Sequence, residues 1–446
     1  MSRHYVLIGS GIAALSAAES IRASDATGKI TLISEERHPF YSRPGLAYLL
    51  DGTVPEDQLW IRSAAYEREL DLDRWHGSAV ELDGHEHLLK LRNGGELRFD
   101  RLLMATGAAS IPPDFPGAGL DGVLQLDGLD GARAIMRRAR HGLFREARAV
   151  VVGGGSTALE IVEGLQHRGV ETHYLLRGTR YWSRVLDPVE SQIVEDRLHG
   201  SGIRLHHRAE ILRAEGRNGT LQAVVTTTGE RIACDILAVA IGVRPRLPFS
   251  ANGELHTDAG VVTDEQMRTS VPDVFAAGDV AQVRYPSNGA GSLDTLWQSA
   301  LHQGRTAGSN MAGASVPYRQ HIALNVTRLA GITTTIMGAI DGGDKDPDLL
   351  TVTRGQSERW RADPNDWTLR ARHGGDRVRL LIGRQHVTGA VIMGDQAPVL
   401  PLGELIDGQV DISSIREHIE AHPDKAVGIL MDFHSAWHRR RHEPAH

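Results

Sequence analysis

The chain has a single cysteine, Cys234, among its 446 residues. One thiol cannot form a disulfide within the chain, and it cannot supply the ligands of a cysteine-rich zinc or iron–sulfur centre. Its scarcity favours a reducing compartment, and we expect the cytoplasm. Cys234 stands in the apolar stretch ERIACDILAVAIG, which is typical of a buried strand rather than of an exposed nucleophile.

Long apolar runs and an excess of basic charge are also missing. No run approaches the roughly 20 residues that cross a bilayer, so we expect no contact with membrane. The net charge of −7 predicts no binding to nucleic acid. The first 20 residues resemble a signal peptide in hydropathy, but their glycine spacing indicates a nucleotide-binding turn instead. Although the chain has 22 histidines, the stretches LHHR and HSAWHRRRHEPAH show no ligand set of defined geometry and no His-Glu-x-x-His motif appears, so we predict no metal site.

Two segments of the chain repeat one pattern. HYVLIGSGIAALSAAESIR and RAVVVGGGSTALEIVEGLQHRG each run from strand through glycine turn to helix, and each is followed by another strand-like stretch. The pattern predicts an α/β fold with two three-layered, Rossmann-like dinucleotide-binding domains, the second inserted in the first, and a C-terminal α+β domain. The expected boundaries are 1–115 with 246–320, 116–245, and 321–446.

The first glycine turn has the spacing Gly-x-Gly-x-x-Ala, formed by Gly9, Gly11 and Ala14. Such a turn lets backbone approach a pyrophosphate, which then lies at the helix N-terminus. Glu35 follows at the end of the next strand, where a carboxylate can bind ribose hydroxyls. The alternative is a structural turn beside an exposed glutamate.

The second unit has the same spacing in Gly153, Gly155 and Ala158. Its next strand ends at Leu176 instead of an acid, with Arg177 directly after it and Arg180 and Arg184 close by. A guanidinium can bind the 2′-phosphate of NADPH, whereas a carboxylate would repel it. The sequence therefore favours NADPH over NADH, unless these arginines form a solvated face.

Two further stretches are typical of apolar strands. The strand in LLMATGA ends at Thr106 and Gly107, and the strand in VPDVFAAGDVA ends at Gly278 and Asp279. In this order with the two glycine units, over roughly residues 4 to 315, they resemble the FAD-dependent pyridine nucleotide oxidoreductases of the glutathione reductase-like class. The resemblance implies that Asp279 binds the ribityl chain of FAD. It also implies that the helix after GSLDTLWQSALHQGRTAG points its N-terminus at the flavin pyrimidine.

The stretch PFYSRPGLAY decides which branch of that class the chain resembles. Members that work through a redox-active cysteine place the sulfur near the position of Pro44. The stretch instead resembles the Tyr-x-Arg-Pro segment of rubredoxin reductases, ferredoxin reductases of oxygenase systems and the flavin portion of assimilatory nitrite reductases. This implies that Arg43 contacts the FAD phosphates or ring edge and that Pro44 stiffens the loop beneath the isoalloxazine, although an ordinary Arg-Pro turn is the alternative.

Other positions match the resemblance less closely. Tyr48 stands where many such reductases have a lysine near flavin N5, so the partner of Glu160, which matches the acid beside the nicotinamide, stays open. Trp297 and Trp182 are candidates for stacking near a ring or for core packing. The segments LNVTRLAGITTTIMGAI and VTGAVIMGD resemble, more loosely, the flavin-shielding C-terminal domain of this group, which also implies a possible homodimer.

The expected function is therefore an FAD enzyme that takes hydride from NADPH or NADH and passes electrons to a small carrier protein such as a rubredoxin or ferredoxin. One alternative is an NAD(P)H oxidase or a reductase of a small-molecule acceptor, such as oxygen, a quinone or a metal ion. Another is a redox-sensing flavoprotein that binds a partner.

Overall fold

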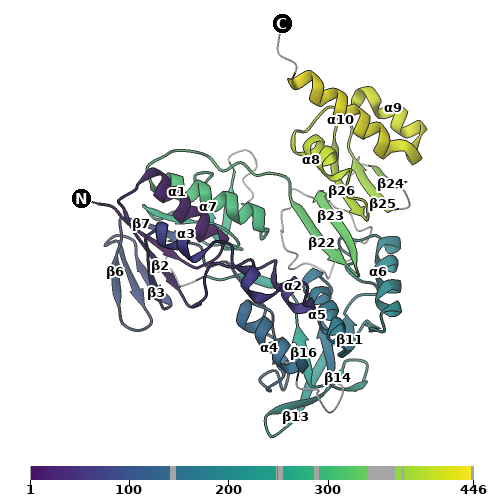
Figure 1. Cartoon of the computed structure of the whole chain (residues 1–446), viewed down its shortest axis with the longest axis horizontal. Helices are drawn as coiled ribbons and strands as arrows, with labels where there is room; N and C mark the ends of the chain where they lie inside the picture. The colour runs from purple at the N-terminus through teal and green to yellow at the C-terminus, as the bar shows by residue number, and fades with distance from the viewer. Residues whose placement is uncertain are drawn as a thin grey trace.

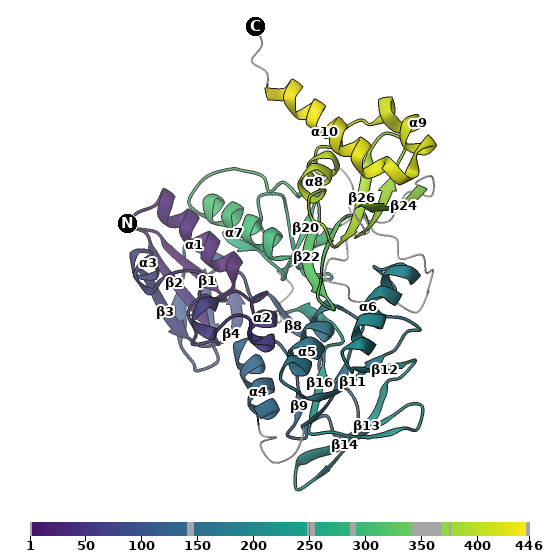
Figure 2. The ribbon, with the colours of Figure 1, turned by 45° about the vertical axis from the view of Figure 1, so that its right-hand side comes forward.

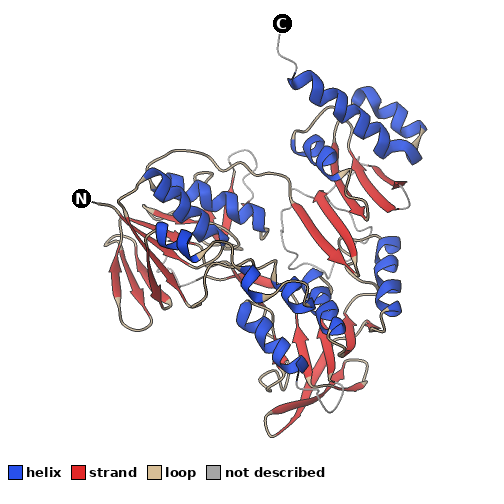
Figure 3. Cartoon of the chain, in the orientation of Figure 1, coloured by secondary structure: helices blue, strands red, loops and turns tan. Residues whose placement is uncertain are grey.

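The fold is built from three large sheets with helices packed on them (Figures 1 and 3). The structure is a computed structural model that describes residues 2–140, 147–247, 249, 255–285, 291–339, 367–373 and 376–442. Two of the large sheets are wholly parallel and the third is antiparallel.

The first sheet joins residues from both ends of a long stretch of chain. Its strands in spatial order are β19 (Val274–Ala276), β7 (Arg101–Met104), β1 (His4–Ile8), β2 (Lys29–Ser34) and β3 (Leu72–His76). Two helices, α1 (Ile12–Ser24) and α7 (Trp297–Met311), lie side by side (Figures 1 and 2). They approach closely because Gly304 and Gly308 lie against the backbone of Ala13 and Ala17.

Shorter elements precede, connect or follow the strands of this sheet along the chain. They are α2 (Leu46–Asp51), η1 (Glu56–Leu59), α3 (Ala64–Glu69), the sheet of β4 (Ala79–Asp83), β5 (Leu88–Leu91) and β6 (Glu96–Arg98), and the sheet of β18 (Val261–Thr263), β20 (Ala281–Arg284) and β21 (Gly291–Leu293). The chain passes to the second sheet and back through an antiparallel pair, β8 (Ala108–Ser110) and β17 (Val243–Pro245).

The second parallel sheet is made from one continuous stretch of chain. Its order is β12 (Arg204–His207), β11 (Glu171–Leu176), β10 (Arg148–Val152), β16 (Ile236–Val239) and β9 (Val123–Leu124). It is accompanied by α4 (Leu129–Arg140), α5 (Ser156–His167), α6 (Pro188–Gly200) and a small antiparallel sheet of β13 (Ile211–Arg217), β14 (Thr220–Thr226) and β15 (Arg231–Ala233). A capping box starts α6, because Asp187 and Glu190 each accept the other's backbone N–H.

The third sheet is antiparallel and follows the other two in the chain. Its order is β22 (Leu324–Leu329), β23 (Ile332–Gly338), β26 (Val387–Met393), β25 (Asp376–Ile382) and β24 (Trp367–His373). The last helical elements are α8 (Val399–Asp407), α9 (Ser413–Ala421), η3 (Pro423–Lys425) and α10 (Ala426–His442). They gather around this sheet at one end of the molecule (Figure 2).

The fold class predicted from the sequence is confirmed: two Rossmann-like parallel sheets are followed by an α+β unit. The prediction for Cys234 is also correct, since its side chain is 1% exposed in an apolar cluster beside β16. Among the residues that the structure describes, we find no helix both long and apolar enough to cross a membrane.

Candidate functional site

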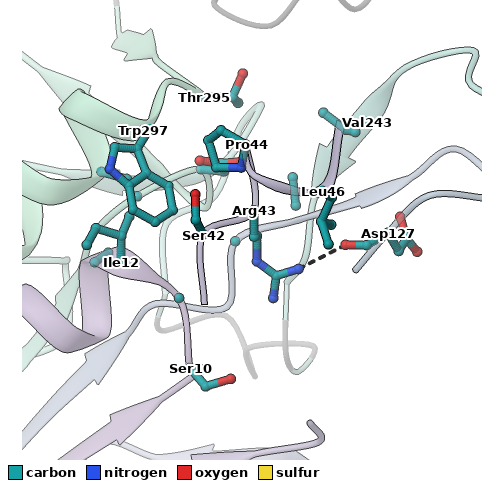
Figure 4. A pocket seen from close by; sticks show the side chains of 18 of the residues that line it. Ser10, Ile12, Ser42, Arg43, Pro44, Leu46, Asp127, Val243, Thr295 and Trp297 are labelled. Carbon is teal, nitrogen blue, oxygen red and sulfur yellow. Dashed lines mark hydrogen bonds between the residues drawn. The ribbon is translucent and has the colours of Figure 1, made fainter. Parts of the chain in front are cut away.

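A cavity of about 900 Å³ lies between the first sheet, α5 and β22, and Figure 4 shows part of its lining. The turn after β1, the end of β2, the loop before α2 and the residues around the start of α7 line one part of it. Residues of α5 and β22 line another part. Twelve of the residues singled out in the sequence share this lining: Gly9, Gly11, Glu35, Arg43, Pro44, Tyr48, Thr106, Gly107, Glu160, Gly278, Asp279 and Trp297.

The first glycine turn fits a bound pyrophosphate. Gly9 has a φ of +114°, and a Cβ there would lie 2.1 Å from the carbonyl oxygen of Ala105, so the close passage of two strands requires glycine. Gly11 is the N-cap of α1, and a Cβ on it would meet no atom within 4 Å. The space beside Gly11 therefore belongs to the cavity. Ala14 is fully buried behind the turn, outside the cavity lining.

Two consecutive acids, Glu35 and Glu36, follow the end of β2. The sequence predicted only Glu35 as a site residue. Glu35 is half exposed and accepts a hydrogen bond from the hydroxyl of Ser78, while an Nη1 of Arg246 lies 3.7 Å from its carboxylate. Glu36 also lines the cavity and accepts two bonds from the Nη2 of Arg43, at 3.1 and 3.2 Å. Either carboxylate could bind a ribose. Each carboxylate pairs with a different arginine. The sequence could not predict this pairing, because it depends on the fold.

The loop of Arg43 and Pro44 forms part of the wall. Nη1 of Arg43 donates to the backbone oxygen of Asp127 over 2.9 Å, a bond drawn in Figure 4, and the guanidinium lies 5.2 Å from the ring centroid of Tyr41. These contacts tie the loop to the chain that leads into α4. Pro44, at the position of the missing cysteine, faces the same cavity.

Another part of the cavity lining carries backbone groups and one unsatisfied hydroxyl. Gly107 and Gly278 have φ values of +68° and +79°, and the N–H of Gly278 donates to Oε1 of Gln303 over 2.8 Å. The hydroxyl of Thr106 donates a hydrogen bond to the backbone oxygen of Arg246 and not to a group in the cavity. The Oγ1 of Thr295 is buried and has no hydrogen-bond partner in the described part of the chain. A buried hydroxyl of this kind fits a polar group on a bound ligand.

Residue Thr295 precedes α7, whose N-cap, Leu296, provides no side-chain cap. The free N–H groups of a first helical turn attract partial negative charge. Neighbouring Asp294 is buried, which raises the pKa of its carboxyl, and it accepts bonds from Ser299 and from the backbone of Leu296. Sequence reasoning missed Asp294 and Thr295, and it expected the helix after GSLDTLWQSALHQGRTAG, whereas α7 begins within that stretch at Trp297.

Helix α5 supplies two acids to the cavity. Glu160 was predicted, and Glu163 was not. Burial raises the pKa of Glu163 to about 7, against the opposing hydrogen bond that its Oε1 accepts from the backbone N–H of Gly331 over 3.0 Å. Tyr48, 42% exposed, lines the cavity from α2. Glu160, Tyr48 and Pro44, the three residues predicted from the sequence to be catalytic, therefore share one space.

The second glycine turn repeats the construction of the first. Gly153 has a φ of +144°, and a Cβ would lie 2.1 Å from the carbonyl oxygen of Ala240, while Gly155 caps α5 with open space around it. Ala158 is fully buried. None of the three lines the cavity described above, but Ser156 and Thr157, directly after Gly155, do.

The arginines after β11 also lie outside the cavity lining. Arg177 is exposed and Arg184 is half-buried. Arg180 donates from Nη2 to the backbone oxygens of Ser183 and Leu186, so it folds its own loop. Trp182 packs beside Tyr181, with 6.1 Å between ring centroids, against the core of the second sheet and not in the cavity.

Comparison with known proteins agrees with this geometry. The model of the pyridine nucleotide-disulphide oxidoreductase family matches residues 3–304. The chain is 29% identical over 344 residues to a rubredoxin-NAD(+) reductase of Pseudomonas putida, covering 76% of this chain and 88% of that protein. It is 31% identical over 343 residues to the ferredoxin–NAD(+) reductase component of the biphenyl dioxygenase system of Paraburkholderia xenovorans, covering 75% and 81%.

Among solved structures, the ferredoxin reductase for the CYP199A2 system from Rhodopseudomonas palustris superposes with a TM-score of 0.80. The superposition covers 92% of this chain and 96% of that one at 23% identity, and it supports the fold.

Proposed function

The chain belongs to the pyridine nucleotide-disulphide oxidoreductase family and is an FAD-dependent NAD(P)H oxidoreductase. We propose that it passes electrons to a small redox protein and that it uses no redox-active cysteine of its own to do so. One observation carries the proposal. Pro44 occupies the cavity wall, and the chain's sole thiol lies elsewhere, where burial raises the pKa of Cys234 to about 12. A thiol so seldom ionised is a poor nucleophile.

The lining residues fit FAD. Bound FAD supplies the exchange between a two-electron hydride donor and one-electron acceptors. The Gly9–Gly11 turn would hold the pyrophosphate at the N-terminus of α1, with Glu35 or Glu36 at the ribose. The free N–H groups at the start of α7 and the hydroxyl of Thr295 would hold the polar edge of the ring. Glu160 would orient the nicotinamide, as the sequence predicted, and Tyr48 lines the same cavity.

The preference between NADPH and NADH is a finer proposal. It is supported by Leu176, a buried apolar residue at the end of β11, and by exposed Arg177 directly after it. Both curated relatives named above carry NAD(+) in their names, so the preference must come from this chain's own residues. Arg177→Ala should raise the KM for NADPH far more than the KM for NADH. Equal changes in the two constants would refute the assignment.

The choice of acceptor is tested by reoxidation. After anaerobic reduction, stopped-flow absorbance should show faster reoxidation by a purified rubredoxin or [2Fe–2S] ferredoxin than by air. A Cys234→Ala variant should match the wild type with each acceptor, because the thiol takes no part. Air or a quinone oxidising the enzyme faster than any carrier would favour the small-molecule alternative. The homodimer and the cytoplasmic location that the sequence suggested stay predictions.

A further inference from the structure

Three side chains of the last domain form a compact polar group, which we call the α8–α10 triad: Glu404, His434 and His438. Nε2 of His434 lies 2.7 Å from Oε2 of Glu404, and Nδ1 of His438 lies 3.6 Å from the same oxygen. The two imidazole centroids are 5.7 Å apart, and one ligand atom from each residue lies within 4.8 Å of the others. The histidines are four residues apart, so they share one face of α10.

The geometry suits a borderline metal ion. Zinc bound tetrahedrally at about 2.0–2.1 Å places its ligand atoms about 3.3 Å apart, and the observed separations of 2.7 and 3.6 Å lie on both sides of that value. Two imidazoles and one carboxylate leave a fourth position for water. Magnesium and calcium prefer oxygen ligands throughout, so this set discriminates against them.

The environment leaves the ligand atoms accessible. The side chain of His434 is 12% exposed and that of His438 is 49% exposed, so the second histidine can turn to meet an ion. Trp437 packs beside His434, with 5.8 Å between ring centroids, which limits the rotation of the first. None of the three residues lines the large cavity, and α10 lies far from α1 in both views (Figures 1 and 2).

We propose that the α8–α10 triad binds one Zn²⁺ ion, which clips the C-terminal helix to α8. This site is independent of the oxidoreductase function proposed above. The sequence did not reveal this site because the third ligand, Glu404, stands 30 residues before His434 in the chain. Without metal, the same atoms form a histidine–carboxylate contact, and the hydrogen bond from His434 lowers the pKa of Glu404.

The experiment uses the full-length, FAD-loaded protein after removal of metal with a chelator that is then dialysed away. Isothermal titration with ZnCl₂ should give one ion per chain. His438→Ala and Glu404→Gln should each weaken binding by about tenfold or more, because each removes a ligand. Zn²⁺ should raise the Tm of the wild type and not that of His438→Ala, since only an ion bound to the folded form stabilises it.

The chain offers a matched control. His418 and His422 are also four residues apart, with ring centroids 4.7 Å apart, but no carboxylate completes a three-ligand group with them in the described residues. The variant His418→Ala/His422→Ala should bind Zn²⁺ as the wild type does. If this control abolishes the stoichiometric site, or if His438→Ala and Glu404→Gln bind Zn²⁺ unchanged, the proposal is wrong. Flavin absorbance confirms that each variant is loaded.

Discussion

Gly9 and Gly11 stand two residues apart in one turn, yet a side chain is excluded at each for a different reason. At Gly9 the obstacle is the chain's own backbone at Ala105, whereas at Gly11 the space is open and belongs to the cavity. The first is needed for folding, and we propose that the second leaves room for a ligand. Spacing in the sequence revealed both glycines but could not distinguish these reasons, because the distinction depends on which strand passes behind the turn.

The two positions should respond differently to the same small change. Gly11→Ala should leave the free energy of unfolding of the apoprotein within about 0.5 kcal/mol of wild type and weaken FAD binding. Gly9→Ala combines a positive φ with a backbone clash and should cost more than about 2 kcal/mol. Urea unfolding of the apoprotein and flavin fluorescence titration measure the two effects. An unchanged FAD affinity in Gly11→Ala would contradict the assignment of that space.

The site residues that sequence reasoning missed share a physical feature. Glu36, Glu163, Thr295 and Gln303 become notable only through a partner or a cavity contributed by another element. Residues whose role lies in their own turn, such as Gly9 and Gly153, carry a local signal that one sequence can show. Arg43 was predicted from resemblance, but its bonds to Glu36 and Asp127 had no sequence signal.

At the scale of elements, α5 connects the second sheet with the third. Its residue Glu163 accepts a bond from the turn between β22 and β23, at Gly331. The carboxyl is buried enough for its pKa to rise from 4.5 to about 7. Burial therefore favours the neutral acid, although the N–H of Gly331 favours the carboxylate, and ionisation costs the folded state free energy.

This cost gives a pH dependence with a definite sign. The folded form binds the proton of Glu163 more tightly than the unfolded form, so stability from this group is complete below pH 4.5 and is lost as pH rises to about 7. Glu163→Gln keeps the acceptor oxygen and removes the charge. At pH 8 it should raise the free energy of unfolding by on the order of 2 kcal/mol.

The comparison has an internal control. At pH 4.5 the wild type and Glu163→Gln should unfold at nearly the same urea concentration, because both side chains are then neutral. Chemical unfolding with saturating FAD, repeated from pH 4.5 to 8, measures the divergence. Parallel curves across that range would show that Glu163 ionises as freely in the folded protein as in the unfolded one.

At the scale of the whole molecule, a buried ion pair joins the third sheet to the second. Arg379 of β25 is fully buried, and its Nε and Nη2 lie 3.0 and 3.1 Å from the carboxylate of Glu190 in α6. Arg377 reaches Asp187 in the same helix turn. The capping box of α6 thus also serves as the anchor for a domain that begins more than a hundred residues later.

Removing one member of the pair should cost more than removing both. Arg379→Met leaves a buried carboxylate without its main counter-charge and should lower the free energy of unfolding by about 3 kcal/mol. In the double variant Arg379→Met/Glu190→Gln, at least half of that loss should return, since glutamine still completes the capping box. Guanidinium unfolding of the FAD-loaded proteins gives both values. Losses that simply add would mean that the two charges do not interact.

The order of strands in the first sheet affects how the chain is made. Strands β1, β2, β3 and β7 leave the ribosome early, but β19 and the partner helix of α1 follow only after the whole second sheet has been synthesised. The second sheet comes from a continuous stretch and can therefore finish folding while the first still lacks an edge. During that interval the small-residue face of α1, at Ala13 and Ala17, lacks the helix that covers it in the folded protein, and we expect chaperones to bind the nascent chain there.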